Sequence, residues 1–309
     1  MIELVFLGTS ASAPSVRRAL PAAVVMHRDR RFLIDCGEGT QRQLLKSGLG
    51  FKRLDTVLLT HGHLDHILGL GGLVSTFARW EAIERMDIHA GAWALERVEA
   101  LMAVVFGTGE PEFNVRYRQV RPGSVLEYQD FSVSAFPVRH RGPGCFGYLF
   151  EERPRRPFLA DKAENLRVPA GPERAALVRG ETVLLSDGRS VSPEEVLGPE
   201  RPGTRLAYVG DTGHTAHLVQ RVAGVDCLVT EATYLEVEKP LARRFGHITA
   251  REAAALARDA GARQLILTHL SRRYSESQVL EEASSVFSNV AVARDFDHYR
   301  ILAGDNGAA

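Results

Sequence analysis

A dense group of polar side chains occupies residues 58–66, where the sequence reads Leu-Leu-Thr-His-Gly-His-Leu-Asp-His. His61, His63, Asp65 and His66 follow an apolar run within six positions. Packing does not explain this density, because His and Asp are rarely buried unless they are paired or bind a metal. Neutral imidazole and carboxylate are zinc ligands. A strand that turns into a helix could direct His61 and His63 to one ion, and Asp65 and His66 to its neighbour.

Three further donors, His140, Asp211 and His269, recur shortly after apolar runs that predict strands. Open α/β sheets place their functional sites where strands end. Taken singly, His140 and His269 could be surface or capping residues, and Asp211 could form a turn. Together with the first four donors, the three match a two-metal site in which Asp211 bridges the ions.

Hydrolysis of a phosphodiester is the chemistry that such a set predicts. Two cations about 3.5–4 Å apart clamp the phosphate and lower the pKa of a shared water toward ~7. Asp65 could accept a proton from that water as well as hold a metal. Glu231 and His247 are not needed as ligands. A Glu–His pair could charge an imidazole that contacts phosphate or protonates the leaving oxygen, although both residues could simply cap local structure.

The elements that must position these residues alternate between short apolar runs and helical patterns, which indicates α/β layers around sheets. Helices are expected at 92–105 and at 249–260, the latter with Thr249 as N-cap, Glu252 three residues later and Gly261 beyond its end. Strands are expected at residues 2–7, 22–27, 32–34, 56–59, 131–138, 205–209, 227–229 and 264–267.

Composition narrows the class of protein. The chain has 309 residues, 45% of them hydrophobic, which is enough for a sizeable core. Lys+Arg and Asp+Glu both number 38, so any basic footprint for a nucleic acid must be local. The three cysteines are far apart and predict buried thiols instead of disulfides or a thiolate zinc site. No segment reads as a signal peptide or membrane span, and we expect a cytoplasmic protein.

The region at about residues 151–203 differs from the rest, because it is rich in Pro, Gly and Arg and its apolar periodicity is weak. It falls between two predicted strands, so we expect a projecting arm inserted into a single domain that spans residues 1–309. Residues 151–180 hold seven basic and five acidic residues. The candidate substrate-binding residues of the arm are Arg153, Arg155, Arg156, Lys162, Gly171, Pro172, Arg174 and Arg179.

The histidine–aspartate cluster with the later His, Asp and His donors resembles the metallo-β-lactamase superfamily, which implies an αββα sandwich. Further motifs resemble the ribonuclease Z family, from about residue 4 to residue 296. They are Phe6-Leu7-Gly8-Thr9 with Pro14-Ser15; the run Asp35-Cys36-Gly37-Glu38-Gly39-Thr40-Gln41-Arg42-Gln43-Leu44; Gly171-Pro172 and Asp187-Gly188-Arg189 in the arm; Gly246-His247 with Thr249-Ala250; and Thr268-His269-Leu270-Ser271 with Arg273-Tyr274.

This resemblance implies two zinc ions per subunit, endonucleolytic removal of the 3′ trailer from precursor tRNA, a 3′-hydroxyl product and a homodimer. In the family, the arm of one subunit holds the tRNA while the other subunit cuts. The sequence departs from the family pattern in three places, one of them Gly213-His214 after the Gly-Asp-Thr motif, where the family often has Arg or Pro. Thr230 stands where the family has His, and the Gly-Pro segment of the arm has Glu173-Arg174 in place of an aromatic residue.

Two other functions fit parts of the pattern. A small-molecule phosphodiesterase or other ester hydrolase of the same fold would share the metal ligands but has no obvious use for the arm. A non-catalytic RNA-binding protein of this fold would lack one or more of the seven ligands, and here all seven positions are filled. The sequence therefore favours the endoribonuclease.

Overall fold

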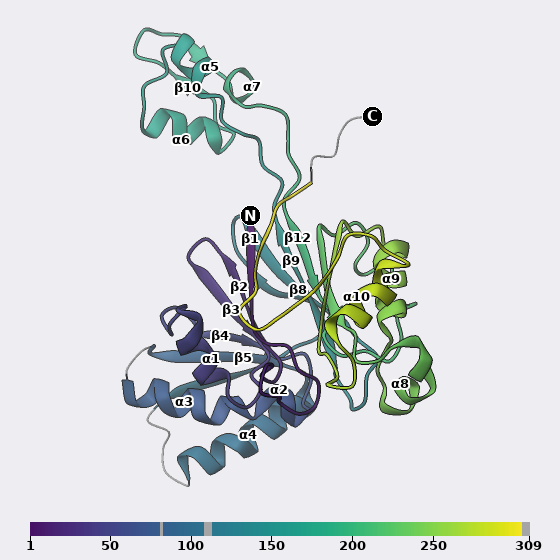
Figure 1. Ribbon diagram of the computed structural model, residues 1–309. Helices are drawn as coiled ribbons and strands as arrows, with labels where there is room; N and C mark the ends of the chain where they lie inside the picture. The colour runs from purple at the N-terminus through teal and green to yellow at the C-terminus, as the bar shows by residue number, and fades with distance from the viewer. Residues whose placement is uncertain (81–82, 108–112, 305–309) are drawn as a thin grey trace.

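Two seven-stranded sheets lie face to face in the computed structural model, with helices on their outer sides (Figure 1). The structure describes residues 1–80, 83–107 and 113–304. The strand order is β16-β1-β2-β3-β4-β5-β6 in the first sheet and β15-β14-β13-β12-β9-β8-β7 in the second. Each sheet contains both parallel and antiparallel pairs. The predicted αββα sandwich of the metallo-β-lactamase type is confirmed.

The first sheet contains β1 (Ile2–Gly8), β2 (Ala22–His27), β3 (Arg30–Ile34), β4 (Thr56–Leu58), β5 (Arg85–Ala90), β6 (Asn114–Gln119) and β16 (His298–Ile301). Its helices are α1 (Thr40–Ser47), α2 (Leu64–Ile67), α3 (Gly69–Trp80) and α4 (Ala92–Phe106). The second sheet contains β7 (Gly123–Glu127), β8 (Phe131–Pro137), β9 (Phe146–Glu152), β12 (Arg205–Tyr208), β13 (Cys227–Glu231), β14 (Gln264–Thr268) and β15 (Val290–Val292). Its helices are α8 (Lys239–Phe245), α9 (Ala250–Asp259) and α10 (Glu276–Ser284), with the short 3₁₀ helix η1 (Glu236–Glu238) before α8.

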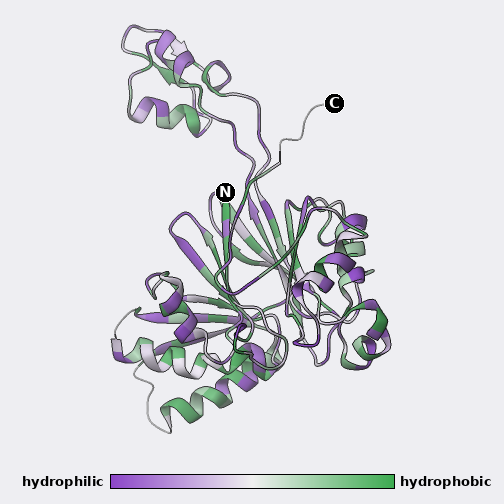
Figure 2. Ribbon diagram, viewed as in Figure 1, coloured by the Kyte–Doolittle hydropathy of each residue, from purple (hydrophilic) through white to green (hydrophobic). Residues whose placement is uncertain are grey.

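Three apolar layers follow from this arrangement, and Figure 2 shows the strands between them as largely hydrophobic. The central layer, between the sheets, is rich in aromatic side chains that pack against one another, among them Phe32, Phe131 and Phe150. The outer layers join the first sheet to α1, α3 and α4, and the second sheet to α9 and α10. Burial of this apolar surface is the main force that holds the layers together.

All eight predicted strands and both predicted helices are present, with ends that differ by at most two residues. Thr249 caps α9 as expected: its side chain accepts from the backbone N–H of Glu252, whose carboxylate accepts from Thr249 N–H. Gly261 follows the helix with φ 64°, a left-handed conformation that favours glycine. The three cysteines are free and buried, as predicted.

Several strands carried no clear sequence signal. In β6 the sequence is Asn-Val-Arg-Tyr-Arg-Gln, and no residue of it is fully buried because it lies at the edge of its sheet. In β9 the second residue is a glycine that interrupts the apolar run, and a Cβ at Gly147 would lie 2.4 Å from the ring of Phe136. Glycine is required there because the aromatic ring packs directly over the backbone.

The start of β9 joins the two sheets beside the polar cluster of residues 61–66. The hydroxyl of Tyr148 donates to the carbonyl of Leu59 at 2.7 Å, and the amide of Phe146 donates to the carbonyl of Thr60 at 2.8 Å. Tyr148 is fully buried, so its hydroxyl needs this partner. These cross-sheet hydrogen bonds fix the end of β4 relative to the second sheet.

Residues 153–203 leave the sandwich between the antiparallel neighbours β9 and β12 and form a projection (Figure 1). We call residues 157–198 the head, and residues 153–156 and 199–203 the stalk. The head has α5 (Ala160–Asn165), α6 (Pro172–Val178), α7 (Pro193–Val196) and the two-stranded β10 (Val183–Leu184) and β11 (Ser190–Val191). It has its own small core, which includes Leu177 and Val196. The expected start of the arm, at residue 151, lies two residues inside the end of β9.

No helix in residues 1–80, 83–107 or 113–304 combines the length and the apolar character needed to cross a membrane.

We predict that the head unfolds independently of the sandwich, because its core shares no residue with the three layers. Leu177→Ala should cost the head about 2–5 kcal/mol, the usual cost of deleting a buried leucine side chain. Hydrogen exchange measured by mass spectrometry should then rise in residues 157–198 and stay unchanged in β1 and β14. Equal loss of protection in those strands would contradict the prediction.

Candidate metal centre

All seven predicted ligands converge at one edge of the sandwich. His61 and His63 lie in the loop after β4, and Asp65 and His66 lie in the short helix α2 that follows. His140 follows β8, Asp211 follows β12, and His269 directly follows β14. Four separate segments of the chain therefore deliver the donor atoms to one place.

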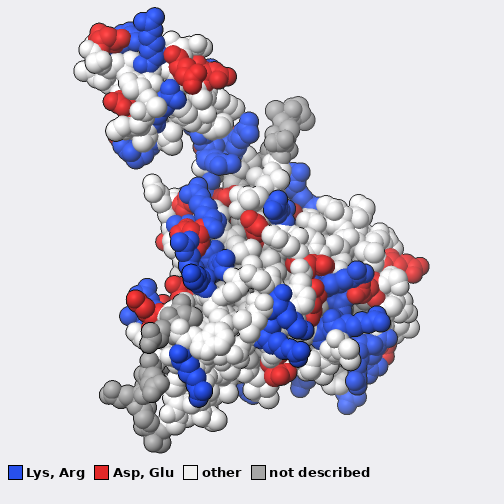
Figure 3. All heavy atoms as spheres, turned by 60° about the vertical axis from the view of Figure 1, so that its left-hand side comes forward, with Lys and Arg blue, Asp and Glu red and all other residues white. Residues whose placement is uncertain are grey.

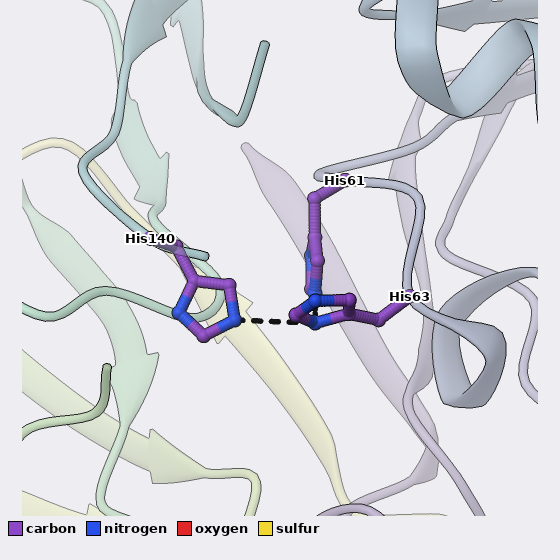
Figure 4. Close-up of side chains that lie close together, drawn as sticks. All are labelled: His61, His63 and His140. Atoms are coloured by element: carbon purple, nitrogen blue, oxygen red, sulfur yellow. Dashed lines mark hydrogen bonds between the residues drawn. The ribbon is translucent and has the colours of Figure 1, made fainter. Parts of the chain in front are cut away.

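The donors form two neighbouring groups. In the first, His61 Nε2 lies 2.9 Å from His63 Nδ1, and His140 Nε2 lies 3.2 Å from that same atom (Figure 4). In the second, Nε2 of His66 and of His269 lie 3.7 and 3.6 Å from Asp65 Oδ2. The donor atoms in each group lie within 4.8 Å of one another, close enough to hold an ion.

Asp211 stands between the two groups. Its Oδ2 lies 3.9 Å from Nε2 of His61 and of His140, and 3.5 and 3.3 Å from Nε2 of His66 and of His269. The side chain is almost fully buried. Burial raises the pKa of this carboxyl, but the imidazoles of His269 and His66 hold the pKa well below its usual range. One carboxylate therefore faces both groups, as a bridging ligand would.

The protonation states suit a cation. Burial, assisted by neighbouring imidazoles, holds the pKa of His61 well below its usual value, and burial lowers that of His63 to about 4. Both rings are neutral at pH 7, as metal binding requires. Burial also lowers the pKa of His66, but the carboxylates of Asp211, Asp35 and Asp65 raise it well above 6.5. That excess of negative charge is what a bound cation would neutralise.

Unsatisfied polar atoms provide the test of fit. Nε2 of His66, Nε2 of His269 and Oδ1 of Asp211 are buried and have no hydrogen-bond partner among the residues that the structure describes. Buried polar atoms normally have hydrogen-bond partners, and a cluster of such atoms with neither partners nor a bound ion would destabilise the folded protein. The residues present therefore fit a pair of divalent cations held by imidazole and carboxylate.

The sequence analysis missed the side chains that orient these histidines. Asp35 Oδ2 accepts from Nδ1 of His66 at 2.8 Å, and Oγ1 of Thr60 lies 3.0 Å from Nδ1 of His61. Oγ1 of Thr233 lies 2.9 Å from Nδ1 of His269, while Nδ1 of His140 donates to the carbonyl of Gly246 at 2.7 Å. Each contact fixes the ring so that Nε2 faces the cluster.

One of these partners had a detectable signal. Asp35 lies in the motif Asp35-Cys36-Gly37 and is 1% exposed, and it also accepts from the backbone N–H of Thr60 at 2.8 Å. Its φ of 55° is unusual for a residue other than glycine. A charged residue directly after the apolar end of a strand, where burial is expected, was the available clue.

Glu231 and His247 are brought together as the sequence suggested. Both carboxylate oxygens of Glu231 lie 3.0 Å from Nδ1 of His247, and the carboxylate also accepts from the backbone N–H of Thr212 at 2.7 Å. Burial lowers the pKa of His247, but Glu231 raises it to about 9, so the imidazole is cationic at neutral pH. Its Nδ1 lies 4.0 Å from Asp211 Oδ2.

The cluster opens into a cleft of about 310 Å³. His63, Asp65, Asp211 and His247 line it. Arg273, which belongs to the final family motif, also lines it, as do Ser12, Arg141, Tyr234 and Phe245, which the sequence analysis did not single out. The backbone N–H of Ser12 donates to Asp65 Oδ2 at 3.1 Å, so the loop between β1 and β2 helps to hold this carboxylate. A positive field from the two arginines suits an anionic substrate.

The candidate substrate-binding residues of the arm lie far from this cleft, at the opposite end of β9 and β12 (Figure 1). Several of them make contacts within the protein. Arg156 donates to the carbonyl of Gly198 at 3.0 Å, Arg174 donates to that of Val168 at 3.1 Å, and Arg179 pairs with Glu181 at 2.7 Å. Gly171 and Pro172 begin α6, and Lys162 lies in α5.

The fold and the cluster define a hydrolase of the metallo-β-lactamase superfamily. A family model described as beta-lactamase superfamily domain matches residues 30–199 and 196–270. The fold is similar to that of the metallo-beta-lactamase fold protein YhfI from Bacillus subtilis, with a TM-score of 0.70, 18% identity, and 96% of this chain and 98% of that one covered. It is also similar to human tRNase Z, short form, with a TM-score of 0.69, 24% identity, and 97% and 99% covered.

Sequence similarity narrows this class. The chain is 47% identical over 298 residues to ribonuclease Z of Bradyrhizobium diazoefficiens, covering 96% of this chain and 99% of that protein. It is 39% identical over 302 residues to ribonuclease Z of Archaeoglobus fulgidus, covering 96% of each. The chain belongs to the ribonuclease Z family.

We predict that Asp35→Asn weakens metal binding without unfolding the protein. The amide keeps the size of the carboxylate but removes the negative charge that orients and polarises His66, which usually costs about 10- to 100-fold in metal affinity. Competition with a chromophoric chelator would measure the zinc affinity. Asp29→Asn, at a side chain that is 67% exposed, is the matched control. Equal affinities of the two variants would remove Asp35 from the support of the site.

Proposed function

We propose that this protein is a cytoplasmic, zinc-dependent endoribonuclease that removes the 3′ trailer from precursor tRNA and leaves a 3′-hydroxyl. Membership of the ribonuclease Z family over nearly the whole chain carries the proposal. The complete donor set supports it, because a member that had lost catalysis would be expected to have lost ligands. The arm supports a large substrate over a small one.

We assign two zinc ions to the seven donors. His61, His63 and His140 would hold one, Asp65, His66 and His269 the other, and Asp211 would bridge them. When bound, the ions would polarise the scissile phosphate and lower the pKa of a water. Asp65, held by the N–H of Ser12, would accept a proton from that water.

We assign the Glu231–His247 pair to the leaving oxygen. Glu231 keeps His247 cationic at neutral pH and fixes the ring through Nδ1, so that Nε2 remains available to substrate. A cationic imidazole in the cleft can stabilise charge on the phosphate and donate a proton to the departing 3′ oxygen. Phosphodiester cleavage on that side leaves the proposed 3′-hydroxyl.

We further propose that the protein acts as a homodimer. The arm and the metal cleft of one chain lie at opposite ends of β9 and β12, which suits an arm that presents RNA to the partner's cleft. The helices over the first sheet also expose apolar side chains: Leu45, Leu64, Leu68, Trp80 and Val104. Figure 2 shows α4 as hydrophobic along most of its length. Contiguous apolar surface is typical of subunit interfaces, so these exposed side chains are candidates for the dimer contact.

The decisive experiment is incubation of the zinc-loaded protein with a precursor tRNA that carries a 3′ extension, with both product ends mapped. The proposal requires a single cut near the end of the acceptor stem and a 3′-hydroxyl on the tRNA. Metal analysis of the same preparation should give two equivalents of zinc per chain. Cleavage absent at every metal load would refute the proposed activity.

Two variants test the roles assigned to Asp65 and His247. Asp65→Ala should nearly abolish cleavage and retain RNA binding, because the substitution removes a ligand and the proton acceptor together. His247→Ala should lower turnover by about 10²–10⁴-fold, the usual contribution of a general acid, with zinc content largely kept. Single-turnover rates and metal analysis would measure both effects. Near-normal turnover in Asp65→Ala would exclude that residue from the mechanism, and loss of zinc in His247→Ala would make His247 a ligand.

Removal of the arm should affect the affinity for RNA and not the chemistry. The backbones of Arg155 and Arg201 are hydrogen-bonded across the stalk at 3.0 and 2.8 Å, so a short Gly linker can replace residues 155–201. The KM for precursor tRNA should rise steeply, whereas hydrolysis of bis(p-nitrophenyl) phosphate should persist because the metal ligands lie in the sandwich. An unchanged KM would mean that the arm does not bind RNA, and a small-molecule substrate would then be favoured.

A further inference from the structure

The charges of the arm are divided unevenly between its head and its stalk. The head has five basic residues (Lys162, Arg167, Arg174, Arg179 and Arg189) and seven acidic ones (Asp161, Glu164, Glu173, Glu181, Asp187, Glu194 and Glu195). The stalk has four arginines (Arg153, Arg155, Arg156 and Arg201) and one acid (Glu200). A polyanion is therefore attracted to the stalk and not to the head.

The stalk forms one wall of a groove of about 650 Å³ where the arm meets the sandwich. The opposite wall comes from the turn between β2 and β3, which contributes Arg28 and Arg30. Six arginines line the groove: Arg153, Arg155 and Arg156 from the stalk, Arg28 and Arg30 from the hairpin, and Arg179 from the head. Three acids, Asp130, Glu152 and Glu194, oppose them, which leaves an excess of three positive charges. Figure 3 shows basic side chains gathered around the junction of arm and body, and mixed charges on the head.

Buried contacts fix the two walls relative to each other. His27, the last residue of β2, is 1% exposed, and its ring is stacked on Phe131 at 4.3 Å. Its Nε2 lies 2.9 Å from Glu152, the last residue of β9, and this carboxylate also accepts from the backbone N–H of Thr204 at 3.1 Å. The hairpin that carries Arg28 and Arg30 is thereby joined to Glu152 and Thr204, the residues on either side of the arm. The groove is therefore formed before any ligand binds.

Three of the six guanidinium groups of the groove, those of Arg28, Arg153 and Arg155, are available to phosphate. Arg155 is exposed and its side chain has no hydrogen-bond or ion-pair partner among the residues that the structure describes. Arg28, 64% exposed, pairs with Asp130 at 2.5 Å, and Arg153, 59% exposed, pairs with Glu127 at 3.3 Å. Exposed ion pairs of this kind are weak, so a phosphate can displace the carboxylate at little cost. Arginine binds phosphate oxygens through two parallel N–H donors.

We propose that this groove binds the sugar-phosphate backbone of the RNA substrate and supplies most of the electrostatic attraction for it, with the hairpin of the sandwich contributing as much as the arm. The inference rests on the proposed function and assigns RNA contacts to residues outside the arm. The groove lies at the far end of β9 from the metal cleft, roughly 20 Å away for seven extended residues. RNA held there contacts the protein at a place separate from the site of cleavage.

The test compares two double variants of the zinc-loaded, full-length protein. Arg28→Ala/Arg155→Ala removes one exposed cation from each wall of the groove. One of the two, Arg28, is ion-paired, as is one of the two in the control variant. Arg167→Ala/Arg189→Ala removes two exposed cations from the head, and Arg189 is paired with Asp187 at 2.7 Å. Both double variants lower the net charge by two. The probe is labelled tRNA without a trailer, which cannot be consumed, and its Kd is measured at several salt concentrations.

The groove variant should bind on the order of tenfold more weakly, and its plot of log affinity against log salt should be flatter by about two, one for each lost phosphate contact. The head variant should bind like the parent. Equal weakening in both variants, or parental binding by the groove variant, would overturn the proposal. Arg28→Lys/Arg155→Lys keeps the charges and should recover most of the affinity.

A substitution that is expected to strengthen binding controls for variants that bind weakly because they are misfolded. Asp130→Asn removes an acid from the groove and releases Arg28 and Arg30, with which Asp130 pairs at 2.5 and 3.2 Å, so it should tighten binding of the same tRNA. Damage to the fold would not tighten binding, and unchanged or weaker binding counts against the groove. Failure of the proposed nuclease function would be recognised separately. The parent protein would then leave precursor tRNA uncut, whatever the tRNA affinities of the variants.

Discussion

Burial of the Asp211 carboxylate among imidazoles is the constraint on which the rest of the molecule depends. One of its oxygens lies within 4.0 Å of five histidine nitrogens, and the other has no hydrogen-bond partner in the described residues. Such an arrangement is expensive in the absence of a cation, since buried polar groups that lack partners destabilise the folded state. The strand ends must therefore be held to within a fraction of an ångström, and the two sheets must keep a fixed offset.

The sandwich meets that requirement through hydrogen bonds near the cluster, some between the two sheets and some on the side of the first sheet alone. Tyr148 and Phe146 connect β9 to the end of β4, and Asp35 connects the end of β3 to both Thr60 and His66. Local backbone strain accompanies the geometry: Asp35 and His269 both have positive φ, at 55° and 54°. Strained residues at a functional site persist only where the surrounding structure holds them, as these buried contacts do.

The sequence predicted the parts of the structure that have a local signal. The density of His61 to His66 had no explanation other than a site, and the capping box at Thr249 is a fixed pattern of neighbours. Asp35, Thr60 and Thr233 have no such pattern, because their roles depend on which distant ring lies beside them in the fold. In the edge strand β6 only Val115 and Tyr117 alternate with polar residues, and neither is fully buried, so the sequence signal is weak. The core of the head escaped notice because its helices are too short to show a period.

The insertion point of the arm has a consequence for how this enzyme family can diversify. Glu151 and Arg205 are partners in the β9–β12 ladder, so the ends of the inserted segment are neighbours whatever its length. The entropy of closing such a loop grows only slowly as residues are added, by about 0.6 kcal/mol for each doubling of its length. The arm can therefore be enlarged, shortened or exchanged in one genetic step while the His and Asp cluster stays in register. What the arm contacts can change during evolution without any change in the geometry of that cluster.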